Sequence, residues 1–274
     1  MSQIPSQQNT GHRARKRFGQ NFLVNEYVIN EIVRAVSAVS GEQIVEIGPG
    51  LGVLTERLVQ SEAQVTAIEL DRDLVGRLQQ RFSDNKKFQL INADALEINF
   101  SDLAKNLGSK KLRVVGNLPY NISTPIMFKL LESAEDITDM HFMLQKEVVK
   151  RLAAKPGTSA WGRLGIMVQY HCDVEELIEV PPDSFDPPPK VDSAVVRLTP
   201  RQTGSKVLSV QMLEKVVRIA FNKRRKTLRN ALKELFTEAQ IINLDVDPNL
   251  RPEKLTLNQY VAFANELSAR EAKE

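Results

Sequence analysis

Sulfur and imidazole side chains are scarce in this chain of 274 residues, which contains one cysteine, Cys172, and three histidines. A single cysteine excludes an internal disulfide, and the absence of disulfides agrees with a reducing compartment. No triad pattern surrounds Cys172, so we do not expect it to act as a nucleophile. With so few potential ligands, we expect no zinc or other metal site.

Long hydrophobic runs are also missing. No apolar stretch approaches the roughly 18 residues that a membrane-spanning helix needs, and the N-terminus is polar and basic without the apolar region of a signal peptide. We therefore expect a cytoplasmic protein without a membrane partner. Hydrophobic residues make up 42% of the chain and charged residues 26%, which is ordinary for a globular protein with a sizeable core. The length favours one large domain with a small one attached.

The net charge is only +3, but the positive residues are unevenly distributed. Two basic runs stand out, namely Arg13, Arg15, Lys16 and Arg17 near the N-terminus and Lys223, Arg224, Arg225 and Lys226 near the C-terminus. Clustered cations of this kind indicate a polyanion partner such as a nucleic acid. For either run alone, a solvated surface is an equally good interpretation.

A glycine-rich loop with Gly48, Gly50 and Gly52 follows a predicted buried strand at residues 44–47. Glycines let the backbone approach a ligand closely, and the helix predicted behind them offers unpaired N–H groups. The next predicted strand ends on Glu69, whose carboxylate could accept hydrogen bonds from both hydroxyls of a ribose. The spacing G-x-G-x-G departs from the dinucleotide pattern G-x-G-x-x-G, which counts against NAD. Without Glu69, an ordinary tight turn would explain the glycines.

Two more predicted strands, at residues 88–92 and 112–115, are each followed by a polar side chain, Asp94 and Asn117 respectively. Strands alternate with helices up to this point, which predicts a mostly parallel sheet with right-handed crossovers. Ligands bind beyond the carboxyl ends of the strands in such sheets. Asp94 could accept a hydrogen bond from an adenine amino group, or it could cap a helix or turn. We expect the strand ends to converge on one crevice.

The loop that begins at Asn117 continues through Leu118, Pro119 and Tyr120. The Asn117 amide oxygen and a loop carbonyl, which we assign to Leu118, could each accept an N–H of an exocyclic amino group. The Tyr120 ring could stack on the same base, as aromatic rings do on extruded bases. Taken alone, the tetrapeptide could also be a strand followed by a tight turn.

Two flanking segments contribute further aromatic side chains. Phe185 lies in a loop that prolines stiffen, and it could be the second face of a sandwich around the base, opposite Tyr120. It could equally be a hydrophobic plug at the edge of the sheet. Residues 18–23 precede a helical pattern at 28–36 and could form a lid, or an arm that packs Phe18 and Phe22 on the domain.

The remaining pattern completes the expected organisation. It predicts helices at residues 53–61, 126–131, 146–153, 210–221, 225–236 and 257–271, and strands at 64–69, 139–144 and 194–198. We divide the chain into a disordered basic arm at 1–17, a main domain at 18–200 and a helical accessory domain at 205–274, with a linker at 199–205. The accessory domain is too small to hold a cofactor, so we expect it to bind the partner.

These motifs together resemble the family of small-subunit ribosomal RNA adenine dimethyltransferases of the KsgA type, whose relatives include erythromycin-resistance rRNA methyltransferases and a mitochondrial transcription factor. The motifs are Q-N-F-L at 20–23, E-I-G-P-G-L-G at 46–52, Glu69, N-A-D at 92–94, N-L-P-Y at 117–120, F-D-P-P-P-K-V-D-S at 185–193 and F-N-K-R-R-K at 221–226. The resemblance implies a Rossmann-like class I methyltransferase fold, a mostly parallel sheet with helices on both faces, plus a small C-terminal all-α domain.

The resemblance also implies the reaction. The methyl donor is S-adenosylmethionine, and the substrate is two adjacent adenosines near the 3′ end of 16S rRNA in a pre-30S particle, each taken to the N6,N6-dimethyl form. The implied donor site is lined by Asn21, Leu23, Gly48, Gly50, Glu69, Asp94 and Asn117. The implied target site contains Asn117, Leu118, Tyr120 and Phe185, and the two basic runs contact RNA. We expect a monomer that takes part in small-subunit biogenesis.

Three other functions remain open from the residues alone. A non-catalytic RNA-binding or assembly factor of the same fold would keep the basic runs but could lose Glu69 or the Asn117 acceptor, and both are present. A DNA adenine methyltransferase uses a similar loop, but its second position is not the leucine that stands here as Leu118. The glycine spacing disfavours a nicotinamide dehydrogenase.

Overall fold

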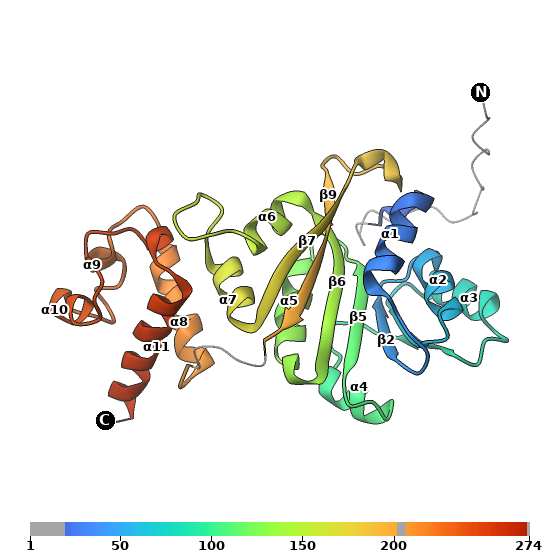
Figure 1. Cartoon of the computed structure of the whole chain (residues 1–274), viewed down its shortest axis with the longest axis horizontal. Coiled ribbons are helices and arrows are strands. Elements are labelled where there is room, and N and C mark those ends of the chain that lie inside the picture. The colour runs from blue at the N-terminus through green and yellow to red at the C-terminus, as the bar shows by residue number, and fades with distance from the viewer. Residues whose placement is uncertain (1–19, 202–206, 273–274) are drawn as a thin grey trace.

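A computed structural model of the chain describes residues 20–201 and 207–272 (Figure 1). The basic run Arg13, Arg15, Lys16 and Arg17 lies outside the described residues. The larger part of the molecule is built on one sheet, and a group of helices near the C-terminus lies beside it (Figure 1).

Seven strands form the main sheet in the order β4-β3-β2-β5-β6-β9-β7. Their bounds are β2 Gln43–Ile47, β3 Gln64–Glu69, β4 Phe88–Asn92, β5 Leu112–Asn117, β6 Ile137–Gln145, β7 Cys172–Val180 and β9 Ser193–Pro200. Strands β2 to β6 are parallel, whereas β9 runs antiparallel to both of its neighbours. The predicted parallel sheet is confirmed, but β7 was not expected, because acidic residues interrupt its apolar pattern.

Helices cover both faces of this sheet, as the sequence predicts. They are α1 Glu26–Val36, α2 Val53–Gln60, α3 Arg72–Arg81, α4 Phe100–Asn106, α5 Ser123–Leu131, α6 Lys146–Leu152 and α7 Arg163–His171. Val28, Leu58 and Leu78 from α1, α2 and α3 belong to one apolar core, and Phe100 and Ile126 from α4 and α5 belong to another. Two separate cores, one on each face, therefore hold the sheet between layers of helices.

Helix α1 is fixed to the sheet at its C-terminal end by two arginines. Arg113 and Arg197 donate hydrogen bonds to the carbonyl oxygens of Val36 and Ala35 at 2.6 and 3.0 Å, which satisfies acceptors that a helix end leaves free. Arg113 also forms an ion pair with Asp139 at 2.7 Å. Because the N-terminal arm leads directly into α1, these contacts also fix where that arm can reach.

A two-stranded sheet joins the N-terminal arm to the proline-rich loop. Strand β1, Phe22–Leu23, pairs antiparallel with strand β8, Phe185–Asp186. The backbone N–H of Val24 extends the contact with a bond to the carbonyl of Ser184 at 2.9 Å. The arm is therefore held by backbone hydrogen bonds to a segment more than 150 residues away along the chain.

The C-terminal helices form a third apolar core. They are α8 Val210–Asn222, α9 Leu228–Ala231, α10 Glu238–Ile242 and α11 Leu257–Glu271. The helices predicted at 210–221 and 257–271 are confirmed, and Val216, Tyr260 and Phe263 are buried between them. Within the ranges that the structure describes, no helix is long and apolar enough to cross a membrane.

The helix predicted at residues 225–236 is wrong over most of its length, because only α9 is an α-helix there. The chain instead turns after α8, where the N–H of Lys226 donates to the carbonyl of Lys223 at 2.8 Å. The N–H of Leu228 then donates to the carbonyl of Leu250 at 2.8 Å. This long-range bond replaces the local helical bond at Leu228, whereas Leu232 and Phe236 still donate to the carbonyls of Leu228 and Leu232 at 2.8 and 2.9 Å.

The two parts of the molecule share apolar contacts. Trp161 and Met167, from the end of the α6–α7 loop and from α7, are buried in the same core as α8 and α11. The Trp161 indole donates to the carbonyl of Leu255 at 2.8 Å. The predicted linker at 199–205 is partly wrong, since β9 continues to Pro200, and residues 202–206 lie outside the description.

One pair of glycines tests how closely the helices pack. A Cβ atom at Gly165 in α7 would lie 2.5 Å from the carbonyl oxygen of Arg151, whereas a Cβ at Gly76 in α3 would meet nothing within 4 Å. Gly165→Ala should lower the free energy of unfolding by about 1–3 kcal/mol. Gly76→Ala should raise it by about 0.5–1 kcal/mol, because alanine is the better helix former. Urea unfolding followed by circular dichroism measures both, and equal effects would contradict the packing.

Candidate active site

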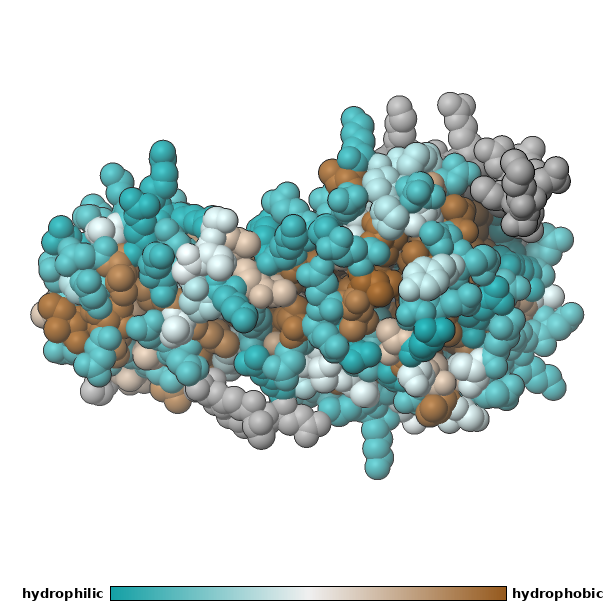
Figure 2. All heavy atoms as spheres, turned by 45° about the horizontal axis from the view of Figure 1, so that its top comes forward, coloured by the Kyte–Doolittle hydropathy of each residue, from teal (hydrophilic) through white to brown (hydrophobic). Residues whose placement is uncertain are grey.

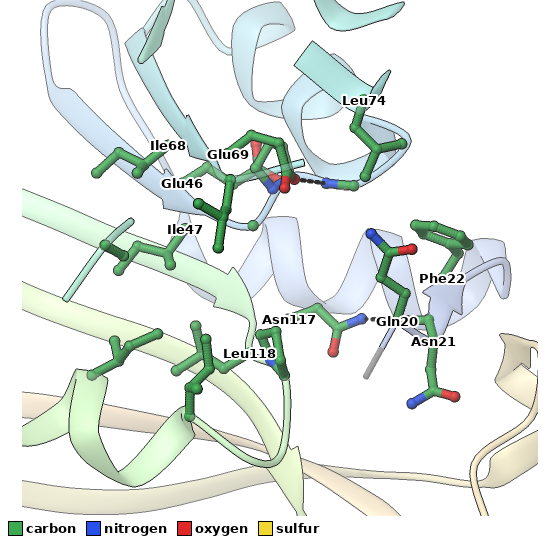
Figure 3. Close-up of a pocket in the computed structure, with 18 of the residues that line it drawn as sticks. Gln20, Asn21, Phe22, Glu46, Ile47, Ile68, Glu69, Leu74, Asn117 and Leu118 are labelled. Carbon is green, nitrogen blue, oxygen red and sulfur yellow. Dashed lines mark hydrogen bonds between the residues drawn. The ribbon is translucent and has the colours of Figure 1, made fainter. Parts of the chain in front are cut away.

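A cavity of about 280 Å³ lies at the carboxyl ends of β2, β3, β4 and β5. The predicted residues Asn21, Leu23, Gly48, Gly50, Glu69, Asp94, Asn117, Leu118 and Tyr120 all line it. Figure 3 shows the labelled side chains coming from the strands on one side and from the N-terminal arm on the other. The convergence of strand ends on one crevice is therefore confirmed.

The glycine-rich loop needs its glycines for shape. Gly48 and Gly50 have φ values of 66° and 59°, in the left-handed region that side chains with a Cβ rarely adopt. A Cβ at Gly50 would also lie 3.1 Å from the Phe22 ring of the arm. The absence of a side chain at Gly50 lets the arm lie directly on the loop.

Glu69 is held in place by two backbone donors. Its carboxylate accepts hydrogen bonds from the N–H of Asp71 at 2.9 Å and from the N–H of Gly50 at 3.3 Å. Burial raises the pKa of Glu69, while these bonds act in the opposite direction. The side chain therefore bridges the glycine loop and the start of α3, with its remaining acceptor capacity at the cavity wall.

Asp94 caps the turn, as one of the two interpretations expects, and it also lies on the cavity wall. One carboxylate oxygen accepts the N–H of Leu96 at 2.9 Å, which fixes the turn after β4. The same residue lines the cavity. A carboxylate has acceptor capacity beyond one such bond, so the capping role and a ligand role are compatible.

Asn117 is oriented by the N-terminal arm. Its amide nitrogen donates to the backbone carbonyl of Asn21 at 2.9 Å (Figure 3). Because an amide has its donor and its acceptor on opposite sides, this bond leaves the oxygen as the group that faces away from the arm. The oxygen is thus the acceptor that the sequence analysis assigned to this position.

The next residues fix the rest of the loop. Leu118 is buried, and its N–H donates to the carbonyl of Met143 on β6 at 3.3 Å. The Tyr120 hydroxyl lies 2.6 Å from the hydroxyl of Ser193, the first residue of β9. Burial raises the pKa of Tyr120, so the phenol is neutral at physiological pH. The ring lines the cavity while its far end is tied to the sheet.

Phe185 is placed differently from the expectation that it forms a second face of the cavity. Its side chain is only 3% exposed and packs in the apolar core with Leu23 and Val180. It is not among the residues that line the cavity, although its backbone pairs with Leu23 of the arm. The alternative interpretation, a hydrophobic plug at the edge of the sheet, describes this position.

The N-terminal arm covers the cavity, which is the geometry expected of a lid. Gln20 donates to the Asp71 carboxylate at 3.1 Å, and β1 pairs with β8. Leu23 anchors the arm, since its side chain is buried in the core beneath it. Phe22 packs on the domain against Gly50, as the packing interpretation expects, whereas Phe18 lies outside the described residues.

The C-terminal basic run is partly engaged within the protein. Lys223 forms an ion pair with Glu234 at 2.8 Å, and Arg224 donates to the carbonyl of Ser159 in the α6–α7 loop at 2.5 Å. Arg225 and Lys226 are exposed. Figure 2 shows hydrophilic side chains over most of the face of the molecule that is turned to the viewer. The run lies in a turn, not at the start of a helix as the sequence suggested.

Glu46 is a cavity residue that the sequence analysis did not assign. It lines the cavity although only 1% exposed, and it accepts a hydrogen bond from the Thr55 hydroxyl. Burial raises its pKa to about 7, and the nearby Glu69 carboxylate adds to this. An acid inside the otherwise apolar run at residues 44–47 is the signal that could have identified it.

The residues present suit S-adenosylmethionine. Glycines at positions where a Cβ would crowd the loop give the backbone access, while Glu69 and Asp94 place carboxylate acceptors on the cavity wall. Two buried acids, Glu46 and Glu69, suit a donor that carries positive charge. No group of three or more metal-ligating side chains occurs within the part of the chain that the structure describes.

The raised pKa of Glu46 predicts a pH effect on stability. Between about pH 4.5 and pH 7 the folded protein holds a proton that the unfolded chain releases, so the free energy of unfolding falls as the pH rises. Glu46→Gln should remove up to about 3 kcal/mol of this decrease. Urea unfolding at pH 5 and pH 8 measures it, with Glu135→Gln on the surface as the control. An unaltered slope in Glu46→Gln would contradict the shift.

Curated proteins similar to this chain share a single description. The chain is 57% identical over 258 residues to the ribosomal RNA small subunit methyltransferase A of Pseudomonas aeruginosa. The aligned residues cover 94% of this chain and 96% of that protein. It is 52% identical over 265 residues to the protein of the same description from Aliivibrio fischeri, with 96% of this chain and 97% of that protein covered.

Solved structures and a family model agree. A dimethyladenosine transferase from Plasmodium falciparum superimposes with a TM-score of 0.79 at 26% identity, covering 91% of this chain and 98% of that one. The 23S rRNA methyltransferase ErmE gives a TM-score of 0.70 at 25% identity, covering 90% and 100%. The model of the family described as ribosomal RNA adenine dimethylase matches residues 11–269. This chain, whose strand ends and Asn117 loop line one cavity, belongs to that family.

Proposed function

We propose that this protein transfers methyl groups from S-adenosylmethionine to the exocyclic amino groups of two adjacent adenosines near the 3′ end of small-subunit rRNA. Each adenosine becomes N6,N6-dimethyladenosine. The observation that carries the proposal is the orientation of Asn117, whose amide nitrogen is bound by the arm so that its oxygen is the available acceptor. The printed names of the relatives support the choice of small-subunit rRNA as the substrate.

The donor is held by the strand ends and covered by the arm. Glu69 accepts from the ribose hydroxyls and Asp94 accepts from the adenine amino group. The bound donor supplies an electrophilic methyl group on a sulfonium, and the electrons of the broken C–S bond remain on the sulfur. Gln20 and Leu23 keep the arm closed through the Asp71 carboxylate and the apolar core, which excludes water from the donor.

The target adenine enters beside Asn117 and Tyr120. Its exocyclic nitrogen is a weak nucleophile, because its lone pair is spread into the ring. The Asn117 amide oxygen and the Leu118 carbonyl accept its two N–H bonds and favour the geometry in which the lone pair points at the methyl group. The nitrogen forms the new N–C bond and then releases one proton to water. No enzyme nucleophile is needed.

The second transfer at the same nitrogen makes a different demand. A monomethylated amino group has one N–H, so it can satisfy only one of the two acceptors. The ring of Tyr120, stacked on the base, then contributes more to alignment than it does in the first transfer. A stacked base is stabilised by roughly 1–3 kcal/mol, which is enough to hold the base while an acceptor is lost.

The C-terminal domain presents the second part of the RNA surface. Arg225 and Lys226 are its exposed cations next to the turn after α8, whereas Lys223 and Arg224 help to hold that turn. We extend the proposal to phosphate contacts by Arg225 and Lys226, together with the N-terminal run at residues 13–17. The proposal also includes that the protein is a monomer and that it acts on a pre-30S particle in the cytoplasm.

Asn117→Ala tests the proposed reaction. It removes an acceptor at the reacting nitrogen, and loss of one such preorganised group should slow methyl transfer by about a hundredfold or more. Mass spectrometry of the rRNA, after incubation with small subunits that lack the modification, counts the mono- and dimethylated products. Asn106→Ala on α4, at the opposite edge of the sheet, should match the parent protein. Activity of Asn117→Ala within a few-fold of the parent would refute the assigned role.

Arg225→Ala combined with Lys226→Ala tests the RNA surface. Each lost phosphate contact should reduce the slope of log affinity against log salt by about 0.7–0.9, and binding should weaken at low salt. Donor affinity, measured by calorimetry, should not change. Lys110→Ala with Lys111→Ala removes the same charge at the far edge of the sheet and provides the control. If both pairs alter the slope equally, the basic run is an ordinary solvated surface.

A further inference from the structure

The hydroxyl of Ser193 is buried directly behind Tyr120. Ser193 is 0% exposed, and its Oγ lies 2.6 Å from the Tyr120 Oη, a short hydroxyl–hydroxyl hydrogen bond. Within the ranges that the structure describes, no other side chain makes a hydrogen bond to the Tyr120 hydroxyl. The bond therefore joins a ring on the cavity wall to a single point behind it.

The position of Ser193 is fixed by the sheet. As the first residue of β9 it pairs with Gln145 on β6 and with Val180 on β7, so strands hold its backbone on both sides. Because β9 is antiparallel to its neighbours, its first residue lies at the edge where the parallel strands end, which is the edge that holds the cavity. A residue at the start of any parallel strand would lie at the opposite edge.

Tyr120 has a less restrained backbone. It lies in the turn between β5 and α5, where the N–H groups of Ile122 and Ser123 donate to the carbonyl of Pro119 at 3.1 and 3.0 Å. The carbonyl of Tyr120 itself accepts one bond, from the Ser123 hydroxyl at 3.2 Å, and no strand pairs with this residue. The hydroxyl of a tyrosine lies on the long axis of the ring. A bond at that atom therefore fixes the direction of the axis, and leaves rotation of the ring plane to the neighbouring atoms.

We propose that Ser193 is a positioning residue for methyl transfer, which fixes the direction of the long axis of the Tyr120 ring beside the target base. The inference rests on the proposed function, since it concerns how that same site aligns adenine. Its effect is largest in the second transfer, where the monomethylated nitrogen keeps only one N–H and the stacked ring carries more of the alignment. Ser193 touches neither base nor donor, so it acts only through Tyr120.

A double-mutant cycle tests this coupling. Ser193→Ala and Tyr120→Phe each remove one end of the bond and keep the ring, so each should slow the second methyl transfer by about threefold to tenfold. The double variant should be no slower than the slower single variant, because the bond can be lost only once. Single-turnover assays on unmodified small subunits, which separate mono- from dimethyladenosine, give both rate constants, and monomethyladenosine should accumulate.

The controls separate positioning from damage to the strand. Ser133→Ala removes another buried serine hydroxyl, beyond the end of α5 at the far edge of the sheet, and should leave both rate constants unchanged. Donor affinity should be the same in all variants. If Ser193→Ala slows transfer as much in the Tyr120→Phe background as in the parent, the serine acts on the strand and the proposal fails.

A measurement without catalysis keeps the two proposals distinguishable. In protein labelled with ¹³C at tyrosine Cζ, Tyr120→Phe identifies one of four tyrosine signals by its loss. Ser193→Ala should shift that signal alone and move its titration to higher pH, because the Ser193 bond lowers the Tyr120 pKa. An unchanged signal would overturn the contact. A parent protein that leaves small subunits unmethylated would instead refute the proposed function, while the spectra still decide the contact.

Discussion

The site depends on one hydrogen bond between segments 96 residues apart, from the Asn117 amide to the Asn21 carbonyl. A free asparagine amide can turn over and exchange its donor for its acceptor, which would present an N–H to an amino group that needs an acceptor. The arm removes this ambiguity. Because the same arm covers the glycine loop through Phe22, one segment both covers the cavity and orients Asn117. A chain without the ordered arm would keep the Asn117 side chain but not its direction.

The antiparallel strand explains how distant segments reach this edge. The five strands β2 to β6 and also β7 deliver their carboxyl ends to it, and β9 delivers its amino end. The loop that leads into β9 therefore passes the cavity as well, where Phe185 pairs with the arm and Ser193 reaches Tyr120. Both the lid and the ring are thus tied to one proline-stiffened segment. Prolines restrict the unfolded states of that segment, which lowers the entropy lost when it is ordered.

Local patterns predicted the parts of the site that depend on backbone geometry. Apolar runs in the sequence indicate where strands end, and glycines indicate turns that need positive φ angles. Gly48, Glu69, Asp94 and Asn117 could therefore be assigned to one edge of the sheet. The misplaced features depend on contacts between distant segments. No periodic pattern around Phe185 indicates whether its ring is buried. Only the pairing of β1 with β8 shows that the ring enters the core. The segment at 225–236 has suitable helix propensity, yet it begins with a turn, and the N–H groups of Leu228 and Arg229 donate to the distant carbonyls of residues 250 and 248.

Two buried acids, Glu46 and Glu69, lower the free energy of unfolding of the ligand-free protein compared with a pocket lined by apolar side chains alone. Burial raises the pKa of both carboxyls, which means that their ionised forms are poorly solvated in the folded state. The Glu69 carboxylate makes the ionisation of Glu46 harder still, and the Asp71 carboxylate does the same for Glu69. A ligand that carries positive charge relieves this repulsion and is favoured over a neutral one of the same shape. Since a ligand that binds only the folded state stabilises it, a positively charged ligand beside these two acids would also raise the free energy of unfolding.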